Sequence, residues 1–207
     1  MYLTIKEQGE NEIIINKSRF ICTIGIATNK EDADEFIKSI RKKNHNATHN
    51  CYAYIIGKDR LLQKSNDDGE PSGTAGIPML EVLKKNKLTD TVCVVTRYFG
   101  GIKLGAGGLI RAYGSSVSEA IKKIGIIQKK YMHKVNVILE YAQIGLFDYK
   151  LNNYRVIDKE YKESVLYTYL VDVDNIKIFI NKIIELTNDN IKYHIGDKVL
   201  CEVEYTE

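Results

Sequence analysis

The apolar positions along residues 1–130 alternate between the two-residue period of strands and the longer period of helices. Runs rich in Val, Ile and Tyr, separated by polar turn residues, predict strands. Gly-Glu-Asn at 9–11 predicts the first turn, and Lys-Asp-Arg at 58–60 predicts a hairpin turn. The expected strands are 2–8, 12–28, 51–57, 61–65 and 91–98.

Helices are expected between several of these strands. Apolar residues at helical spacing mark the segment 31–43, with Asn29 as its N-cap, and a longer segment at about 107–124. A short helix is expected at 78–83, because the proline that opens it gives up no intrahelical hydrogen bond at the first position. The chain from 91 to 124 is therefore predicted to be a strand, a glycine-rich turn and a helix.

Residues 131–207 predict a second domain, joined to the first by a linker at 125–132. Val135, Val137 and Leu139 alternate as a strand does. The elements expected after it are a helix at 144–154, strands at 156–162 and 165–173, a helix at 176–184 and a strand at 199–205. This βαββαβ order is that of the ferredoxin-like fold. We expect an α+β protein with domains 1–130 and 131–207.

Composition narrows the class of protein. The chain has 207 residues, of which 44% are hydrophobic and 28% charged, as is typical of a soluble globular protein. No apolar run approaches the roughly 20 residues that span a bilayer, and the N-terminus lacks the apolar centre of a secretory signal. Cysteines at 22, 51, 93 and 201 form no C-x-x-C pair. We therefore expect reduced thiols, a cytoplasmic location, and no disulfide framework, metal site or cofactor.

The segment 97–114, RYFGGIKLGAGGLIRAYG, is the most informative feature of the sequence. Six of its last fifteen residues are glycine, where ordinary usage gives about one. Glycine permits positive φ and a close approach of the backbone, and cations lie among these glycines. The candidate contacts to a polyanion or nucleic acid are Arg97, Gly100, Gly101, Lys103, Gly105, Gly107, Gly108 and Arg111.

The distribution of charge agrees with this interpretation. Residues 1–130 hold 21 Lys and Arg against 14 Asp and Glu, a net charge of +7, whereas residues 131–207 hold 9 against 13, a net charge of −4. Residues 1–70 balance, so the excess lies in 71–130, around the glycine segment. A concentrated positive field attracts anionic partners. An ordinary solvated face of a lysine-rich protein would show the same excess.

The glycine segment matches neither nucleotide-binding fingerprint. Read from Gly105, the third glycine of G-x-G-x-x-G would fall at Ile110, and Ala106 stands where a P-loop requires lysine. Three interpretations stay open: glycines that permit tight packing, a polyanion surface, or a small-ligand or phosphate site in a cleft beside the loop 67–76.

The loop DDGEPSGTAG at 67–76 carries a second set of candidates. Its carboxylates could bind a hard metal ion, could cap a helix start, or could pair Asp68 or Glu70 with Arg97 or Arg111 and so hold the glycine segment. We favour the structural interpretation over catalysis. The residues of this possible supporting loop are Asp67, Asp68, Glu70, Ser72 and Thr74.

A nucleophilic site could be drawn from His45, His49, Cys51 and Ser72. His49 and Cys51 share a face of one expected strand by periodicity alone, and the sequence shows no orienting third group and no oxyanion hole. We therefore name no catalytic residue and favour a protein that is not an enzyme.

Three motifs, THNCYAY (48–54), DDGEPSGTAG (67–76) and RYFGGIKLGAGGLIRAYG (97–114), resemble in this order the signature blocks of the Impact/YigZ family. Residues 131–207 are similar to the smaller C-terminal domain of its bacterial members. The resemblance implies an N-terminal ribosomal-protein-type β-α-β domain like domain four of elongation factor G. The ferredoxin-like domain resembles domain five of that factor. One departure is Ile77, where bacterial relatives commonly have Lys or Arg.

The resemblance also implies a role in translation. Eukaryotic Impact proteins regulate translation by competing for the activator of an initiation-factor kinase, and they use an additional N-terminal domain that we do not expect in this chain. We therefore predict a translation-associated or regulatory protein that binds RNA, the ribosome or a translation-linked protein, without a membrane partner and without DNA sequence specificity. The alternatives are a small-ligand-binding protein or enzyme that uses the cleft, and a protein-interaction module that uses the exposed sheet face of the C-terminal domain.

Overall fold

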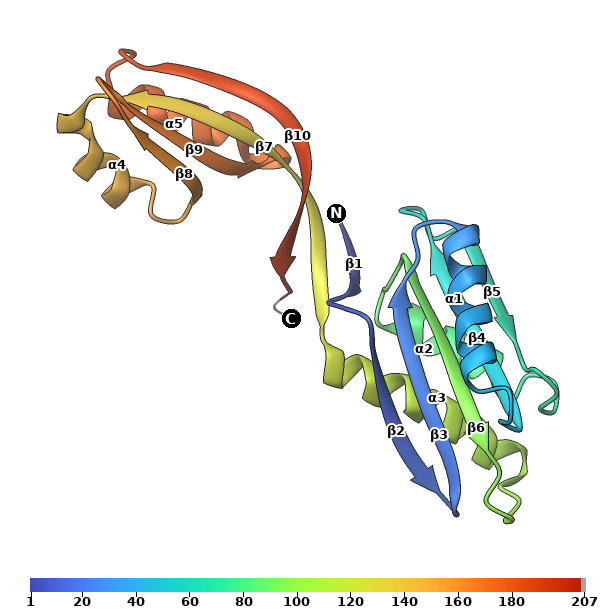
Figure 1. The fold of residues 1–207 in the computed structure, drawn as a ribbon. Helices are drawn as coiled ribbons and strands as arrows, with labels where there is room; N and C mark the ends of the chain where they lie inside the picture. The colour runs from blue at the N-terminus through green and yellow to red at the C-terminus, as the bar shows by residue number, and fades with distance from the viewer. Residues whose placement is uncertain (206–207) are drawn as a thin grey trace. The chain divides into compact units, whose positions relative to one another are not determined.

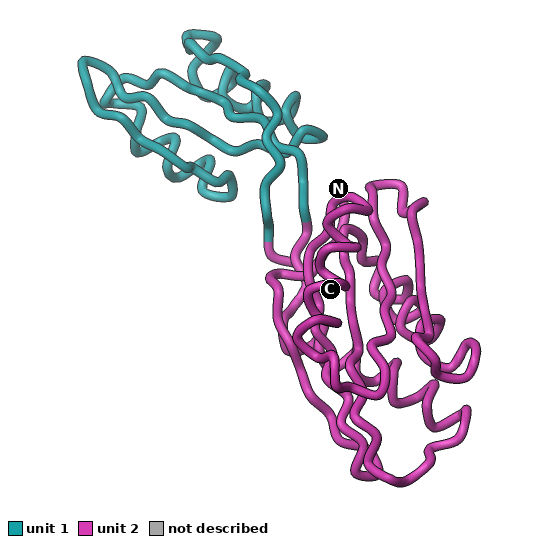
Figure 2. Tube along the Cα trace, turned by 45° about the vertical axis from the view of Figure 1, so that its right-hand side comes forward, with its two compact units in different colours: residues 1, 129–203 teal, residues 2–128, 204–207 magenta. Residues whose placement is uncertain are grey.

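The computed structural model describes residues 1–205, which divide into two compact units (Figures 1 and 2). Residues 2–128 form the N-terminal unit and residues 129–203 form the C-terminal unit. Both units combine helices with antiparallel sheets. The α+β class expected from the sequence is confirmed.

The N-terminal unit is built on a sheet with the strand order β2-β3-β6-β4-β5 (Figure 1). Neighbouring strands run antiparallel throughout this sheet. Its elements in chain order are β1 (Tyr2–Ile5), β2 (Gly9–Ile15), β3 (Ser18–Ile26), α1 (Lys30–Lys43), β4 (His49–Ile56), β5 (Leu62–Asn66), α2 (Gly76–Lys85), β6 (Thr91–Tyr98) and α3 (Gly105–Ile124).

Two apolar cores cover the two faces of this sheet. Side chains of α2 and α3 pack on one face, where they meet residues such as Cys51, Cys93 and Val95. The helix α1 packs on the opposite face against the alternate positions, such as Tyr52 and Val94. The strands β4 and β6 are therefore buried on both sides, which explains why their sequences are almost continuously apolar.

The first turn lies elsewhere than the sequence predicted. Residues 9–11 belong to β2, and the chain reverses at Asn16 and Lys17, whose φ angles are 46° and 64°. A two-residue hairpin turn of this kind needs positive φ at both positions, which asparagine tolerates well. Gly9 lies in this strand and not in a turn, and a Cβ there would lie 2.9 Å from the side chain of Ile124, so close packing against α3 accounts for the glycine.

The helices of this unit largely agree with the expectations. Asn29 caps α1, because its side chain accepts a hydrogen bond from the N–H of Asp32 at 2.8 Å. The helices α2 and α3 begin two residues earlier than predicted, at Gly76 and Gly105. Glycine is a weak helix former in isolation, so the apolar stripe alone could not place these two starts.

The C-terminal unit confirms the βαββαβ order. Its sheet joins β10, β7, β9 and β8 in that order, and α4 and α5 pack on the core through Phe147 and Phe179. The boundary between the two units falls within the predicted linker 125–132, but residues 126–132 form the start of a long strand and not an irregular connection. The elements are β7 (Ile126–Leu139), a short 3₁₀ turn (Tyr141–Gln143), α4 (Ile144–Lys150), β8 (Arg155–Tyr161), β9 (Val165–Asp172), a second 3₁₀ turn (Val173–Asn175), α5 (Ile176–Leu186) and β10 (Lys192–Glu204).

Across residues 1–205, none of the helices combines the length and the apolar character that crossing a bilayer requires.

Candidate functional site

The glycine segment forms the loop between β6 and α3 and the first turn of α3. Gly100 has a packing role: a Cβ there would lie 2.1 Å from the backbone carbon of Lys17, in the turn between β2 and β3. Gly101 and Gly105 have φ angles of 84° and 68°, which side chains disfavour. Part of the glycine content is therefore required by the path of the chain.

The first turn of α3 presents a positive surface, which we call the basic turn: Lys103, Gly105–Gly108 and Arg111. The N-cap residue Leu104 offers no capping side chain, and the first turn holds no acidic residue. Its leading N–H groups thus lack intrahelical acceptors. Lys103 and Arg111 are exposed, and neither side chain forms a hydrogen bond or an ion pair with any residue in 1–205. Arg111 reaches back over the turn, with its Nη1 3.7 Å from the position that a Cβ on Gly107 would take.

Arg97 lies in a different environment from these two cations. It is only 5% exposed, and its Nη1 donates to Oε1 of Glu70 at 2.5 Å. The same carboxylate oxygen accepts a hydrogen bond from the hydroxyl of Tyr113 at 2.8 Å. The guanidinium also lies between the rings of Phe20 and Phe99, at 5.3 and 5.5 Å from their centroids. The predicted pairing of Glu70 with Arg97 is confirmed, so this arginine holds the loop 67–76 against the sheet.

Asp67 fixes the start of α2. Its carboxylate accepts hydrogen bonds from the backbone N–H groups of Gly73, Ala75 and Gly76, at 2.8–3.0 Å. Burial by itself would raise the pKa of this carboxyl, but the three N–H groups outweigh it and lower the pKa below its ordinary value. Asp67 therefore has the capping role that was one of the alternatives for this loop.

Asp68 is the link between this loop and α1. Its carboxylate accepts from Nη2 of Arg41 at 2.6 Å and from the backbone N–H of Asn50 at 2.7 Å. Neither Arg97 nor Arg111 is its partner. Thr74 is buried and bonds to the carbonyl of Pro71 at 2.7 Å, whereas Ser72 is exposed. Four of the five loop candidates thus make contacts that stabilise the loop.

The groups considered for nucleophilic chemistry do not form a catalytic arrangement. The Sγ of Cys51 lies 2.9 Å from the carbonyl oxygen of Asp67 and 3.4 Å from the hydroxyl of Tyr113. Burial raises the pKa of this thiol to about 12, so it is protonated at neutral pH and a poor nucleophile. His45 and Ser72 are exposed on other segments. No three His, Cys, Asp or Glu side chains within 1–205 are grouped so that they could hold a metal ion.

A cleft of about 470 Å³ lies between the loop 67–76 and the start of α3. Its polar wall includes His49, Glu70 and Arg97, which β4, the loop and β6 bring together. The basic turn contributes Lys103, Gly105 and Ala106 to the opposite wall. Arg111 is outside the cleft. Of the predicted candidates, Glu70 from the loop 67–76 and Arg97, Lys103 and Gly105 from the glycine segment line this cleft.

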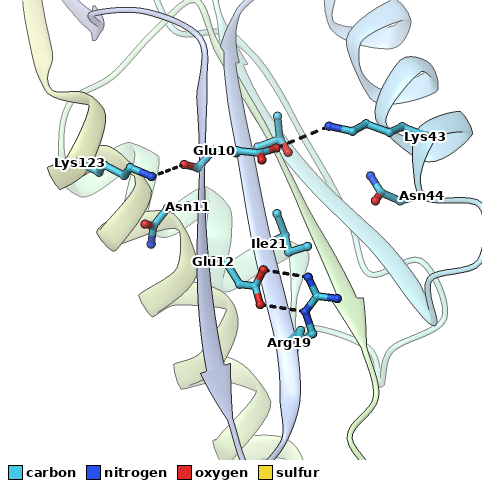
Figure 3. Close-up of a pocket in the computed structure, with 9 residues that line it drawn as sticks. Glu10, Asn11, Glu12, Arg19, Ile21, Lys43, Asn44 and Lys123 are labelled. Atoms are coloured by element: carbon cyan, nitrogen blue, oxygen red, sulfur yellow. Dashed lines mark hydrogen bonds and ion pairs between the residues drawn. The ribbon is translucent and has the colours of Figure 1, made fainter.

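A second groove, of about 360 Å³, lies over β2 and β3 (Figure 3). Its charged groups are matched with one another: Arg19 binds both carboxylate oxygens of Glu12, at 2.8 and 2.9 Å, and Lys43 lies 3.8 Å from the carboxylate of Glu10. Lys123 donates to the backbone carbonyl of Glu10 at 3.0 Å. These contacts stabilise the edge strand β2, and we do not consider this groove a functional site.

The fold and the cleft define a two-unit α+β protein whose N-terminal unit carries the candidate site. The family model of the Impact N-terminal domain matches residues 16–121, and that of the domain of unknown function DUF1949 matches residues 137–190. The chain therefore belongs to the IMPACT family, as its three motifs predicted.

Individual proteins agree over nearly the whole chain. IMPACT family member YvyE of Bacillus subtilis is 52% identical over 97% of this chain and 94% of its own length. IMPACT family member YigZ of Escherichia coli is 32% identical over 86% of this chain and 89% of its own length. A crystal structure of a hypothetical protein superposes with a TM-score of 0.61 at 30% identity, covering 95% of this chain and 97% of that one.

Sequence reasoning missed the partners that organise the site, notably Arg41, Phe20 and Tyr113. Tyr113 belongs to the apolar stripe of α3, so its hydroxyl gave no separate signal. A usable signal did exist for Arg97, because it alternates with Cys93 and Val95 on the core-facing side of β6. Because alternate positions of a strand share one face, this spacing predicts that the side chain of Arg97 is buried.

Proposed function

We propose that the basic turn binds the phosphates of RNA, free or in the ribosome, and that the protein acts in translation without catalysing a reaction. The observation that carries the proposal is the exposed start of a 20-residue helix with no capping side chain, flanked by Lys103 and Arg111. Helix N-termini favour anions because the leading N–H groups and the helix dipole are both positive.

Two further observations support this proposal. The net charge of +7 in residues 1–130 arises in the segment 71–130, which contains the basic turn. Gly107, where a Cβ would meet only Nη1 of Arg111, keeps the surface of that turn free of bulky side chains, so a phosphate backbone could approach it closely. The link to translation rests on membership of the IMPACT family and on what the family resemblance implies.

In this proposal Lys103 and Arg111 make the phosphate contacts, and Arg97 positions the loop behind them. The buried ion pair with Glu70 occupies Arg97, and removing a buried charge from its partner is costly. The glycines at 100, 101 and 105 shape the path of the chain, Gly107 permits the approach of the ligand, and Gly108 permits close packing, because a Cβ there would lie 3.0 Å from Cβ of Leu104.

The test is the binding of a short fluorescent single-stranded RNA to the full-length protein at several salt concentrations. The double variant Lys103→Ala, Arg111→Ala should bind more weakly. The slope of log K against log salt should fall by about 1.4, since each phosphate contact on single-stranded RNA contributes about 0.7.

The matched control removes one lysine and one arginine from the C-terminal unit, as Lys150→Ala, Arg155→Ala, both of which are exposed. It changes the net charge equally and should leave the slope unchanged. Absence of RNA binding by the parent protein at low salt, or an equal loss in the control, would contradict the proposal. If the protein binds a translation-linked protein and no RNA, the basic turn would be assigned to that alternative partner.

A further inference from the structure

The proposal for RNA leaves most of the cleft between the loop 67–76 and the start of α3 without a role. At about 470 Å³ the cleft has the size of a small-molecule site. Pro71, Phe99, Leu104 and Leu109 give it apolar walls, and a few polar groups converge in it. That combination is typical of sites for ligands with an apolar body and one charged end.

His49 presents a hydrogen-bond acceptor to this cleft. Its Nδ1 lies 2.8 Å from the carbonyl oxygen of Asp68, which can only accept, so Nδ1 carries the hydrogen. In the neutral ring Nε2 is then an acceptor. It lies 3.8 Å from Oε2 of Glu70, beyond hydrogen-bond distance. With the ring neutral, these two acceptors have no hydrogen bond between them, and an N–H or amino group of a ligand could donate to both; a protonated ring would pair with Glu70 instead.

The charges at the cleft favour an anion at its α3 side. The carboxylate of Glu70 is balanced by Arg97, a side chain more than nine-tenths buried whose Nε has no hydrogen-bond partner among residues 1–205. The charges beyond this pair are Lys103 and the positive start of α3. A lysine beside leading N–H groups of a helix suits a phosphate.

The apolar walls favour an aromatic body for the same ligand. Phe99 is 47% exposed and lines the cleft. A large aromatic side chain left in contact with solvent beside a cation offers a surface on which a planar ring can stack. Leu104 and Leu109 add apolar contacts near the phosphate end.

We propose that this cleft binds a phosphomonoester joined to an aromatic base. The phosphate would lie against Lys103 and the first N–H groups of α3, the base against Phe99, and a base N–H between His49 and Glu70. Two sources share this chemistry: a free nucleoside monophosphate, and the 5′-phosphorylated end of an RNA strand. The inference goes beyond the proposed function, because it concerns a ligand held inside the cleft. The phosphate contacts proposed above include Arg111, which lies outside the cleft.

The experiment titrates the full-length protein with adenosine 5′-monophosphate, followed by calorimetry and by amide NMR shifts at the start of α3. Adenosine and inorganic phosphate serve as the probes that lack one half of the ligand. We expect saturable binding of the nucleotide, at least about tenfold tighter than that of either fragment. No binding at millimolar nucleotide, or equal binding of adenosine, would overturn the proposal.

A variant that blocks the cleft distinguishes binding inside the cleft from binding to the rest of the basic turn. Ala106 is exposed and lines the cleft, so Ala106→Phe should fill it without changing the charge, and thermal unfolding will verify that the variant folds. It should abolish nucleotide binding, whereas Arg111→Ala should retain it. Nucleotide binding that survives Ala106→Phe, or that depends on Arg111, would contradict the placement.

The sources are distinguished with two RNA oligonucleotides of one sequence, one with a 5′ phosphate and one with a 5′ hydroxyl. A preference for the phosphorylated strand that Ala106→Phe removes assigns the cleft to RNA ends. Equal affinity together with nucleotide binding assigns it to a free nucleotide. Nucleotide binding without any RNA binding would reject the proposed function and leave this inference standing.

Discussion

The two walls of the cleft use charged residues in opposite ways. On the wall formed by β4, β6 and the loop 67–76, Asp67, Glu70 and Arg97 all have partners within the protein. On the wall formed by α3, Lys103 extends into solvent beside helix N–H groups that lack a cap, and Arg111 does so from the same helix, outside the cleft. One motif, RYFGGIKLGAGGLIRAYG, supplies residues to both walls.

This difference shows that a cation in a signature motif can have a purely structural role, and that only an exposed, unpaired cation is available to a ligand. Arg97 and Arg111 are fourteen positions apart in sequence, and equal in charge. The strand period of β6 turns the first toward the core, while the surface of α3 carries the second outward. Removing residues from the first wall should therefore affect folding, and removing residues from the second should affect binding.

The largest effect is expected from Glu70→Ala. This change leaves the buried guanidinium of Arg97 without its carboxylate and removes the acceptor of the Tyr113 hydroxyl. Breaking a buried ion pair in this way costs about 3–5 kcal/mol, measured as the free energy of urea unfolding. Glu12→Ala breaks the exposed pair with Arg19 and should cost far less. Similar losses in the two variants would contradict the contrast between buried and exposed charge.

Gly100→Ala should follow in size. The added methyl would meet the backbone of Lys17 at 2.1 Å, and overpacking of this kind costs about 1–3 kcal/mol. Gly145 in α4 has no atom within 4 Å of an added Cβ. Gly145→Ala should therefore keep or raise the stability, by up to about 1 kcal/mol, because alanine favours helix. Denaturant midpoints compare the two, and a neutral Gly100→Ala would show that the loop can shift.

Asp67→Asn tests the cap of α2 and its pH dependence. The folded protein lowers the pKa of Asp67, so the ionised cap contributes stability above the unfolded pKa of about 4, and the contribution is lost as pH falls through the folded pKa. At pH 7 we expect a loss of about 1–2 kcal/mol in the free energy of unfolding. The difference between parent and variant should shrink in acid. A difference that stays constant to strongly acidic pH would argue against the carboxylate as the cap.

The smallest effect concerns the reactivity of Cys51. Because burial raises the pKa of its thiol to about 12, the native protein should resist alkylation at Cys51 up to alkaline pH. Cys201 is partly exposed and should react first. Peptide mapping after brief treatment with iodoacetamide measures both rates. Comparable modification of the two cysteines at neutral pH would mean that the structure around Cys51 opens transiently and exposes the thiol to solvent.

The pattern of the sequence predicted most of the fold, because the strands β6 and β9 and the helix α1 carry strong local signals. The failures are local as well. The turn at Asn16 and Lys17 contains no glycine, and the segment 126–132 lacks an alternation clear enough to be recognised as a strand. The strand β7 that begins there pairs with β10, which comes from the far end of the sequence.

The candidate site was predictable in part. The motifs located the glycine segment and the acidic loop, and charge chemistry suggested a pairing between Glu70 and Arg97. The contacts of Asp68 with Arg41 and Asn50 were not accessible, since they depend on how α1 and β4 pack beside the loop. Phe20 and His49 flank Arg97 across neighbouring strands, and this register is a property of the sheet.

The most direct test of the central claim is Gly107→Ala, with RNA affinity and the free energy of unfolding measured on the same protein. A Cβ at this position would meet only Nη1 of Arg111, at 3.7 Å, and the φ angle is not in the left-handed region. Stability should therefore stay constant or rise by up to about 1 kcal/mol. If the basic turn receives a phosphate backbone, the added methyl should weaken RNA binding nonetheless. Unchanged affinity in a variant of parental stability would contradict the account.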